Sequence, residues 1–166
     1  LHNCNEYLEA QYGVFKIRGC PVNVNYRYKA DELVYLLDNA DAEAVVYQAC
    51  YAMRIWEIRK RLPKLRLLIQ VDDGTELLLD GAIDYERSIA RSAPLPRMTR
   101  NPGDVYMLYT GGTTGMPKGV MYPGGQFSQF LTAMGAVARG LPPPERIADV
   151  PDLVRRVEAP PVSLPA

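Results

Sequence analysis

The sequence predicts an α/β fold, and three observations carry this prediction. Short apolar runs typical of buried strands alternate with stretches of helical periodicity between residues 22 and 92. This alternation is typical of parallel βαβ units. Two further apolar runs, residues 105–109 and 120–122, enclose a segment rich in glycine and threonine. A length of 166 residues is enough for a domain with a real core.

Residues 1–92 form the predicted βαβ region. Its strands are expected at residues 44–47 and 65–71, and its helices at 5–17, 30–39, 53–61 and 80–92. Residues 21–26 alternate like a short strand, although their two asparagines could equally belong to a loop. The helix over 30–39 has the clearest pattern, with acidic residues in its first turn and an apolar stripe. In the helix over 80–92, the side chains of Ile83, Tyr85 and Ile89 are expected to face inward. The basic side chains of residues 54 and 59–61 are more typical of a solvated face than of a binding site.

The second half of the chain divides into three predicted segments. Residues 93–103 contain Pro94, Pro96 and Pro102 and form a linker. Residues 104–125 form a strand, a loop and a second strand, which the breaker at 123–125 closes. Residues 126–166 contain a helix, a short surface helix at 149–158 and an extended tail. The apolar stripe of the first helix is expected to face a core, with lipid binding as the alternative; it comprises Phe127, Phe130, Leu131, Met134 and Val137.

Composition narrows the function classes. Lys plus Arg and Asp plus Glu both number 19, and this balance argues against a general nucleic-acid binder. No apolar run approaches the length of a membrane helix. The cysteines Cys4, Cys20 and Cys50 lack C-x-x-C spacing and are expected to be buried reduced thiols in a cytoplasmic protein. The single histidine, His2, makes a histidine-based triad or zinc site improbable.

The segment between the last two strands has the composition of a phosphate-binding loop. Its sequence, with the flanking strand residues, is YTGGTTGMPKGV. Glycines let backbone N–H groups approach one anion, threonines add neutral donors, and Lys118 adds a charge. A Walker A loop would need Gly-Lys-Ser/Thr followed by a helix, and neither is present. The alternative is a hairpin turn without a ligand, but a tight hairpin does not need so long a segment.

This string resembles the phosphate-binding loop of the acyl-adenylate-forming enzymes, which include acyl-CoA synthetases, luciferases and adenylation domains. The upstream stretch VNVNYRYKADELVYLLDNADAEAVVY is similar to the region that precedes this loop in fatty-acyl-CoA synthetases. Asn23, Asn25, Tyr26 and Arg27 belong to the more specific part of this stretch, and a structural turn is favoured for them over ligand contact. The resemblance extends over nearly all of residues 1–122. It implies that the chain is part of the N-terminal domain of that fold.

The resemblance also implies an activity and a set of binding residues. A full-length relative would be an AMP-forming acid–thiol ligase that uses ATP, Mg2+ and coenzyme A to convert a carboxylic acid, expected to be a fatty acid, to its thioester. The residues expected to bind the ATP phosphates are Thr110, Gly111, Gly112, Thr113, Thr114, Gly115 and Lys118. The family's magnesium-binding glutamate and catalytic lysine have no counterpart in these 166 residues, so no residue is assigned to catalysis.

Two features suggest that the chain is a fragment. It begins with Leu1 rather than Met, and its last residues resemble a strand that leads into a further family motif. The segment alone is therefore expected to be inactive, because the C-terminal domain is absent. Two other functions stay open: an adenylation domain that serves a carrier protein, and a non-catalytic remnant that binds nucleotide or acts as an interaction module.

Overall fold

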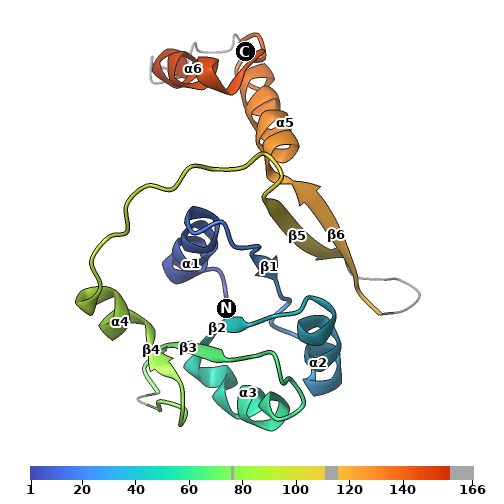
Figure 1. The fold of residues 1–166 in the computed structure, drawn as a ribbon, viewed down its shortest axis with the longest axis vertical. Coiled ribbons are helices and arrows are strands. Elements are labelled where there is room, and N and C mark those ends of the chain that lie inside the picture. Colours follow the sequence, from blue (N-terminus) through green and yellow to red (C-terminus); the bar gives the residue numbers. More distant parts are fainter. Residues whose placement is uncertain (76, 111–115, 158–166) are drawn as a thin grey trace, which may run out of the picture. The chain divides into compact units, whose positions relative to one another are not determined.

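The computed structural model describes residues 1–75, 77–110 and 116–157, which form two separate units. The first unit comprises Leu1–Thr99 and Tyr106–Met121, and the second comprises Arg100–Val105 and Tyr122–Ala166. Figure 1 shows the helices and strands in chain order. They are α1 (Asn5–Lys16), β1 (Val22–Asn23), α2 (Ala30–Asn39), β2 (Ala44–Gln48), α3 (Ala52–Arg59), β3 (Leu67–Val71), β4 (Ile83–Asp84), α4 (Tyr85–Arg91), β5 (Val105–Thr110), β6 (Lys118–Pro123), α5 (Gly124–Val137) and α6 (Val150–Val157).

Two three-stranded sheets confirm the predicted α/β class. One has the strand order β1-β5-β6 and the other β2-β3-β4. β1 pairs in parallel with β5, so that Val22 lies opposite Met107. β2 pairs in parallel with β3 over five residues, and β3 pairs in parallel with β4. The helix between β2 and β3 is the crossover that parallel neighbours require.

The core of the first unit lies between α2, α3 and the β2-β3-β4 sheet. α2 covers exactly the predicted residues, and its buried positions Leu33, Leu36 and Leu37 follow a helical spacing. The Glu32 carboxylate accepts a hydrogen bond from the Lys29 N–H at 2.8 Å and so satisfies a donor at the start of this helix. Other core members are Tyr47, Ala52, Ile55, Ile58, Leu62, Leu68 and Leu79. The apolar stripe expected on the helix over 30–39 is thus confirmed.

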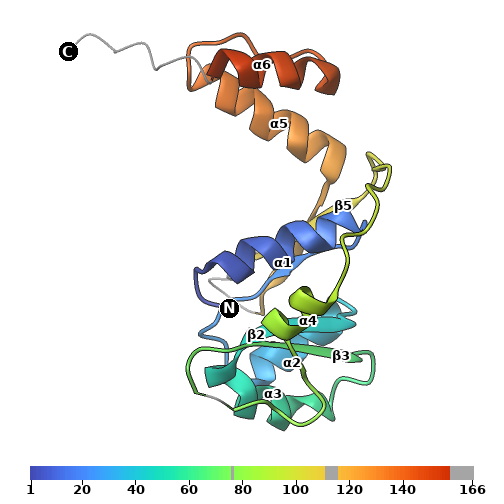
Figure 2. The same cartoon turned by 90° about the vertical axis from the view of Figure 1, so that its left-hand side faces the viewer.

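Helices α1 and α4 lie on the side of the β2-β3-β4 sheet away from α2 and α3 (Figure 2). The Tyr85 hydroxyl donates to the Glu9 carboxylate at 3.0 Å and so joins α4 to α1. α1 also contacts β5, because the Gln11 amide donates to the Tyr106 hydroxyl and the Phe15 ring packs edge-on against the Tyr106 ring. These contacts connect the two sheets of the unit through α1.

The prediction for residues 80–92 was partly wrong. Residues 83 and 84 form β4, and the helix begins only at Tyr85, where the Asp84 carboxylate accepts from the Arg87 N–H at 2.7 Å. Tyr85 is buried as expected, but Ile83 and Ile89 are 43% and 51% exposed. For residues 21–26, where strand and loop were both open, the structure has a two-residue strand, Val22–Asn23, and no strand over residues 24–26.

The prediction that the three cysteines are buried was also wrong. All three thiols are free, as expected, but Cys20 and Cys50 are exposed and Cys4 is only partly buried. Cysteine is often buried, yet its position in the sequence gives no information about which face a loop turns to solvent.

The second unit contains α5 and α6, and here the prediction of a buried stripe was wrong. The side chains of Phe130, Leu131, Met134 and Val137 are each more than half exposed, whereas Ala136 is buried. The predicted breaker at 123–125 ends β6, but Gly124 also begins α5. A Cβ atom on Gly124 would lie 2.8 Å from the Asp104 carbonyl oxygen, so this close approach requires glycine.

Replacement of the buried Leu36 tests the core. Leu36→Ala should lower the free energy of unfolding by about 2–5 kcal/mol, because the side chain is fully buried and its loss leaves a cavity. Met53, on α3, is 67% exposed and provides the control, for which Met53→Ala should change stability by less than about 0.5 kcal/mol. Equal effects of the two substitutions in urea denaturation would contradict this packing.

Tyr47 should make stability depend on alkaline pH. Burial raises its pKa from 10.0 to about 12. Between these values the unfolded chain loses the proton and the folded chain keeps it, so the free energy of unfolding falls as pH rises through this window and is unaffected below it. Tyr47→Phe should make the decrease in the free energy of unfolding between pH 9 and 12 smaller than in the wild type. Tyr12→Phe, at a position that is 60% exposed, should leave this decrease as in the wild type.

Candidate functional site

The β5-β6 hairpin brings together the two described residues that the sequence assigned to phosphate binding. Thr110 is the last residue of β5 and Lys118 the first residue of β6. The Thr110 Oγ1 donates to the Lys118 carbonyl oxygen at 3.5 Å, so the two residues lie side by side. The other assigned residues, Gly111, Gly112, Thr113, Thr114 and Gly115, lie outside the described residues.

Thr110 and Lys118 share one face of the hairpin. Side chains alternate between the faces of a strand, so neighbours that lie opposite each other on two paired strands point the same way. Both residues are exposed, so their side chains are accessible to a ligand from solvent. An anion with several oxygen atoms could accept from the Lys118 ammonium group and, once the Thr110 hydroxyl turns away from the Lys118 carbonyl, from that hydroxyl as well.

The opposite face of the hairpin carries Tyr109 and Gly119. A Cβ atom added to Gly119 would lie 3.0 Å from Cζ and 3.2 Å from Cε2 of Tyr109, so the ring lies directly against this glycine. The Tyr109 hydroxyl donates to Asn39 Oδ1 at 2.7 Å. Burial raises the pKa of Tyr109, as do the neighbouring Tyr35, Asp41 and Cys20. The sequence did not single out this contact between β5 and α2.

Residues 25–28 form a turn, which supports the reading favoured from the sequence for Asn25, whereas Asn23 belongs to strand β1. The Asn25 side chain accepts from the Arg27 N–H at 3.0 Å, and its carbonyl accepts from the Tyr28 N–H. The Arg54 guanidinium donates to the Tyr28 carbonyl at 2.8 Å. Arg54 is therefore not a solvated member of the basic cluster but part of the support of this turn.

Arg59 is a second member of the basic cluster with a structural role. Its guanidinium lies 3.5 Å from the centre of the Trp56 ring and donates to the Asp80 carbonyl at 2.9 Å. Lys60 and Arg61 are exposed, as expected of a solvated face, and Arg61 pairs with Asp31 at 2.8 Å. Half of the cluster thus holds loops in place and half faces solvent.

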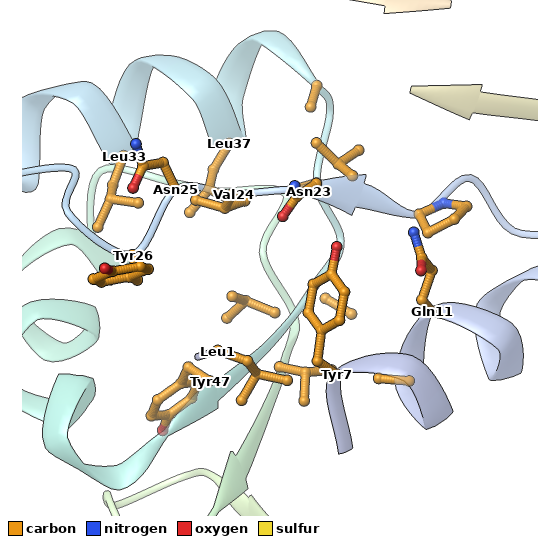
Figure 3. Close-up of a pocket in the computed structure, with 18 of the residues that line it drawn as sticks. Leu1, Tyr7, Gln11, Asn23, Val24, Asn25, Tyr26, Leu33, Leu37 and Tyr47 are labelled. Atoms are coloured by element: carbon orange, nitrogen blue, oxygen red, sulfur yellow. The ribbon is translucent and has the colours of Figure 1, made fainter. Parts of the chain in front are cut away.

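An apolar cavity of about 260 Å³ lies between α1, α2 and the strands β1 and β2. In Figure 3, Leu33 and Leu37 of α2 lie across this cavity from Leu1 and Tyr7. Its walls include one side of β1 and one side of β2, each the outermost strand of its sheet among the described residues. A more polar cavity of about 370 Å³ shares Leu1, Tyr7 and residues 23–26 with it and reaches Tyr28 and Tyr109. The lining of the first cavity accommodates apolar groups and carries no cluster of acid–base groups.

The described part of the chain holds neither a cluster of metal ligands nor a helix suited to cross a membrane. Among residues 1–75, 77–110 and 116–157, no three or more His, Cys, Asp or Glu side chains come together as a metal site would require. His2 contacts the Tyr26 ring edge-on and forms a hydrogen bond with the Tyr51 hydroxyl, and no carboxylate partner is described for its ring. Within the same residues, no helix has the length and apolar character needed to cross a membrane.

Comparison with known proteins places these features in a family. Residues 1–150 match the profile described as AMP-binding enzyme. The chain is 45% identical over 162 residues to a medium-chain acyl-CoA ligase, Mig, of Mycobacterium avium, and this match covers 96% of the chain and 29% of the relative. It is 42% identical over 123 residues to a 3-oxocholest-4-en-26-oate–CoA ligase of Rhodococcus rhodochrous, with coverage of 72% and 22%. The chain thus spans less than a third of the length of these relatives.

The fold is also similar to solved structures. A crystal structure of the anthranilate CoA ligase AuaEII in complex with anthranoyl-AMP matches with a TM-score of 0.68 and 24% identity, over 78% of this chain and 24% of that one. At this identity the likeness concerns the fold alone. The expected relation to the acyl-adenylate-forming enzymes is confirmed by the profile and by the close relatives. The chain belongs to the AMP-binding enzyme family.

Proposed function

We propose that the full-length protein is an ATP-dependent acid–thiol ligase that activates a fatty acid and transfers it to coenzyme A. The observation that carries this proposal is the pairing of exposed Thr110 and Lys118 at the two ends of a glycine- and threonine-rich segment. The names of the relatives support the acceptor and the substrate class, since both are CoA ligases and one is named for medium-chain acyl groups.

The reaction has two steps, formation of an acyl-adenylate and transfer of the acyl group to coenzyme A. A carboxylate oxygen of the acid attacks the α-phosphorus of ATP, the bond to the bridging oxygen breaks, and pyrophosphate leaves with its electrons. The sulfur of coenzyme A then attacks the acyl carbon, the bond to the AMP oxygen breaks, and the thiol proton is released. Negative charge develops on the β-phosphate as pyrophosphate leaves, and fixed donors aimed at that charge lower the barrier.

The residues assigned to phosphate binding stabilise this charge in three ways. Lys118 contributes a full positive charge, Thr110, Thr113 and Thr114 contribute hydroxyl donors, and Gly111, Gly112 and Gly115 contribute backbone N–H groups. Mg2+ binds phosphate oxygens strongly and is usually held in such sites by few protein ligands. The donor set fits this arrangement, because hydroxyl and backbone groups favour the phosphates and no carboxylate is assigned among them. Mg2+ would supply charge neutralisation there.

Lys118→Ala should reduce kcat/KM for ATP in ATP–pyrophosphate exchange by about 100-fold or more, the scale of losing a preorganised charge contact. The difference from the wild type should shrink as ionic strength rises, because salt screens the interaction of a charge more than that of a neutral donor.

The double substitution Thr113→Ala with Thr114→Ala should cost about 2–4 kcal/mol of transition-state stabilisation, with little dependence on salt. Lys60→Ala, at an exposed position on α3's C-terminal side, is the matched control and should leave the rate unchanged. Wild-type exchange in Lys118→Ala would refute the assignment.

The expressed segment of residues 1–166 should not form an acyl hydroxamate from ATP, hydroxylamine and a fatty acid. The chain spans less than a third of its relatives, and the exposed apolar side chains of α5 favour association over a stable monomer. We expect the segment to elute as aggregates in size-exclusion chromatography. A monomeric segment that turns over substrate would contradict this expectation and show that residues 1–166 suffice for activation.

A further inference from the structure

The ring of Tyr109 fills the space over Gly119, the residue that follows Lys118 in β6. Any side chain at position 119 would meet the ring, because even a Cβ atom would lie 3.0 Å from Tyr109 Cζ and 3.3 Å from Met107 Sδ. Aromatic residues often cover a glycine on the neighbouring strand and so restore the packing that glycine lacks. The backbone at Gly119 is therefore held from one side by an aromatic surface.

The hydroxyl end of the same ring is held by α2. Tyr109 donates to Oδ1 of Asn39, the last residue of this helix. α2 itself is fixed in the core by Leu36, which is fully buried, and by Leu37. A tyrosine hydroxyl keeps its proton at neutral pH and so remains a donor, and burial raises the pKa of Tyr109 further. The ring thus links the core, through α2, to the hairpin backbone beside Lys118.

The alternation of side chains along the hairpin separates this link from the ligand. Thr110 and Lys118 lie on one face, and Tyr109, Met107 and Gly119 lie on the other. Tyr109, bonded to Asn39, therefore contacts the backbone from which Thr110 and Lys118 extend, on the face of the hairpin away from these two side chains. Such a contact changes how well a binding group is aimed, and small misplacements of aimed groups are costly.

We propose that Tyr109 and Asn39 are positioning residues that hold Lys118 and Thr110 in the geometry for polyphosphate binding. This inference rests on the proposed function. Asn39 and Tyr109 are 70 positions apart, and the bond between them is a single neutral hydrogen bond at the surface. Its loss should therefore weaken phosphate binding moderately, whereas the loss of Lys118 removes the charge itself.

The test measures the Kd of inorganic tripolyphosphate by calorimetry in the full-length protein, together with KM for ATP, kcat and the thermal midpoint. Tyr109→Phe keeps the ring and removes the donor, and Asn39→Ala removes the acceptor. Each should raise the Kd and KM about 3- to 10-fold. The double variant should be no weaker than either single variant, because either change alone breaks the bond.

Tyr85→Phe is the matched control. It also removes a tyrosine hydrogen bond of the first unit, the one to Glu9 at 3.0 Å. It should lower the thermal midpoint and leave the Kd of tripolyphosphate unchanged. If Tyr109→Phe and Asn39→Ala behave like Tyr85→Phe, the two residues serve stability alone and the inference is overturned.

Lys118→Ala in the same assay separates this inference from the proposed function. If Lys118→Ala weakens tripolyphosphate binding and Tyr109→Phe does not, the positioning role fails and the phosphate site stands. If Lys118→Ala binds as the wild type does, the phosphate site itself fails. A strictly additive double variant would also contradict a shared hydrogen bond as the cause.

Discussion

The burial of the apolar stripe of α2 is the interaction on which the rest of the first unit depends. Leu36 is fully buried, and Leu33 and Leu37 pack beside it against α3 and the β2-β3-β4 sheet. These contacts fix the axis and the end of the helix, and therefore the position of Asn39. Through its bond with Tyr109, the end of α2 meets the hairpin that carries Thr110 and Lys118. The packing of α2 in the core is thus connected to the candidate site by a chain of direct contacts.

Local patterns predicted the parts of the fold that local forces determine. α2 was predicted to the residue, because its acidic first turn, leucine spacing and terminal asparagine all lie within ten residues. The amphipathic pattern failed where burial depends on a partner. α5 has the periodicity of a core helix, yet Phe130 and Met134 are exposed. Ile89 is exposed for the same reason: periodicity identifies a face but cannot supply the surface that covers it.

In the candidate site, too, the sequence predicted the features that depend on neighbouring residues and missed those that depend on distant ones. Glycine, threonine and lysine between two apolar runs are a local signal, and the hairpin places Thr110 beside Lys118 as that signal implies. The contacts behind the hairpin leave no such signal, since Tyr109 and Asn39 are separated by 70 positions. Arg54 is similar, because a basic residue on a helix surface gives no hint that it donates to the Tyr28 carbonyl. Such residues become visible only once the chain is folded.

The central claim is that the β5-β6 hairpin binds the phosphates of ATP. The most direct measurement is a crystal structure of the full-length protein with a non-hydrolysable ATP analogue. We expect Lys118 Nζ and Thr110 Oγ1 within hydrogen-bond distance of the β- or γ-phosphate oxygens, with the Tyr109 ring still packed against Gly119. A triphosphate bound elsewhere, with Lys118 directed into solvent, would contradict it.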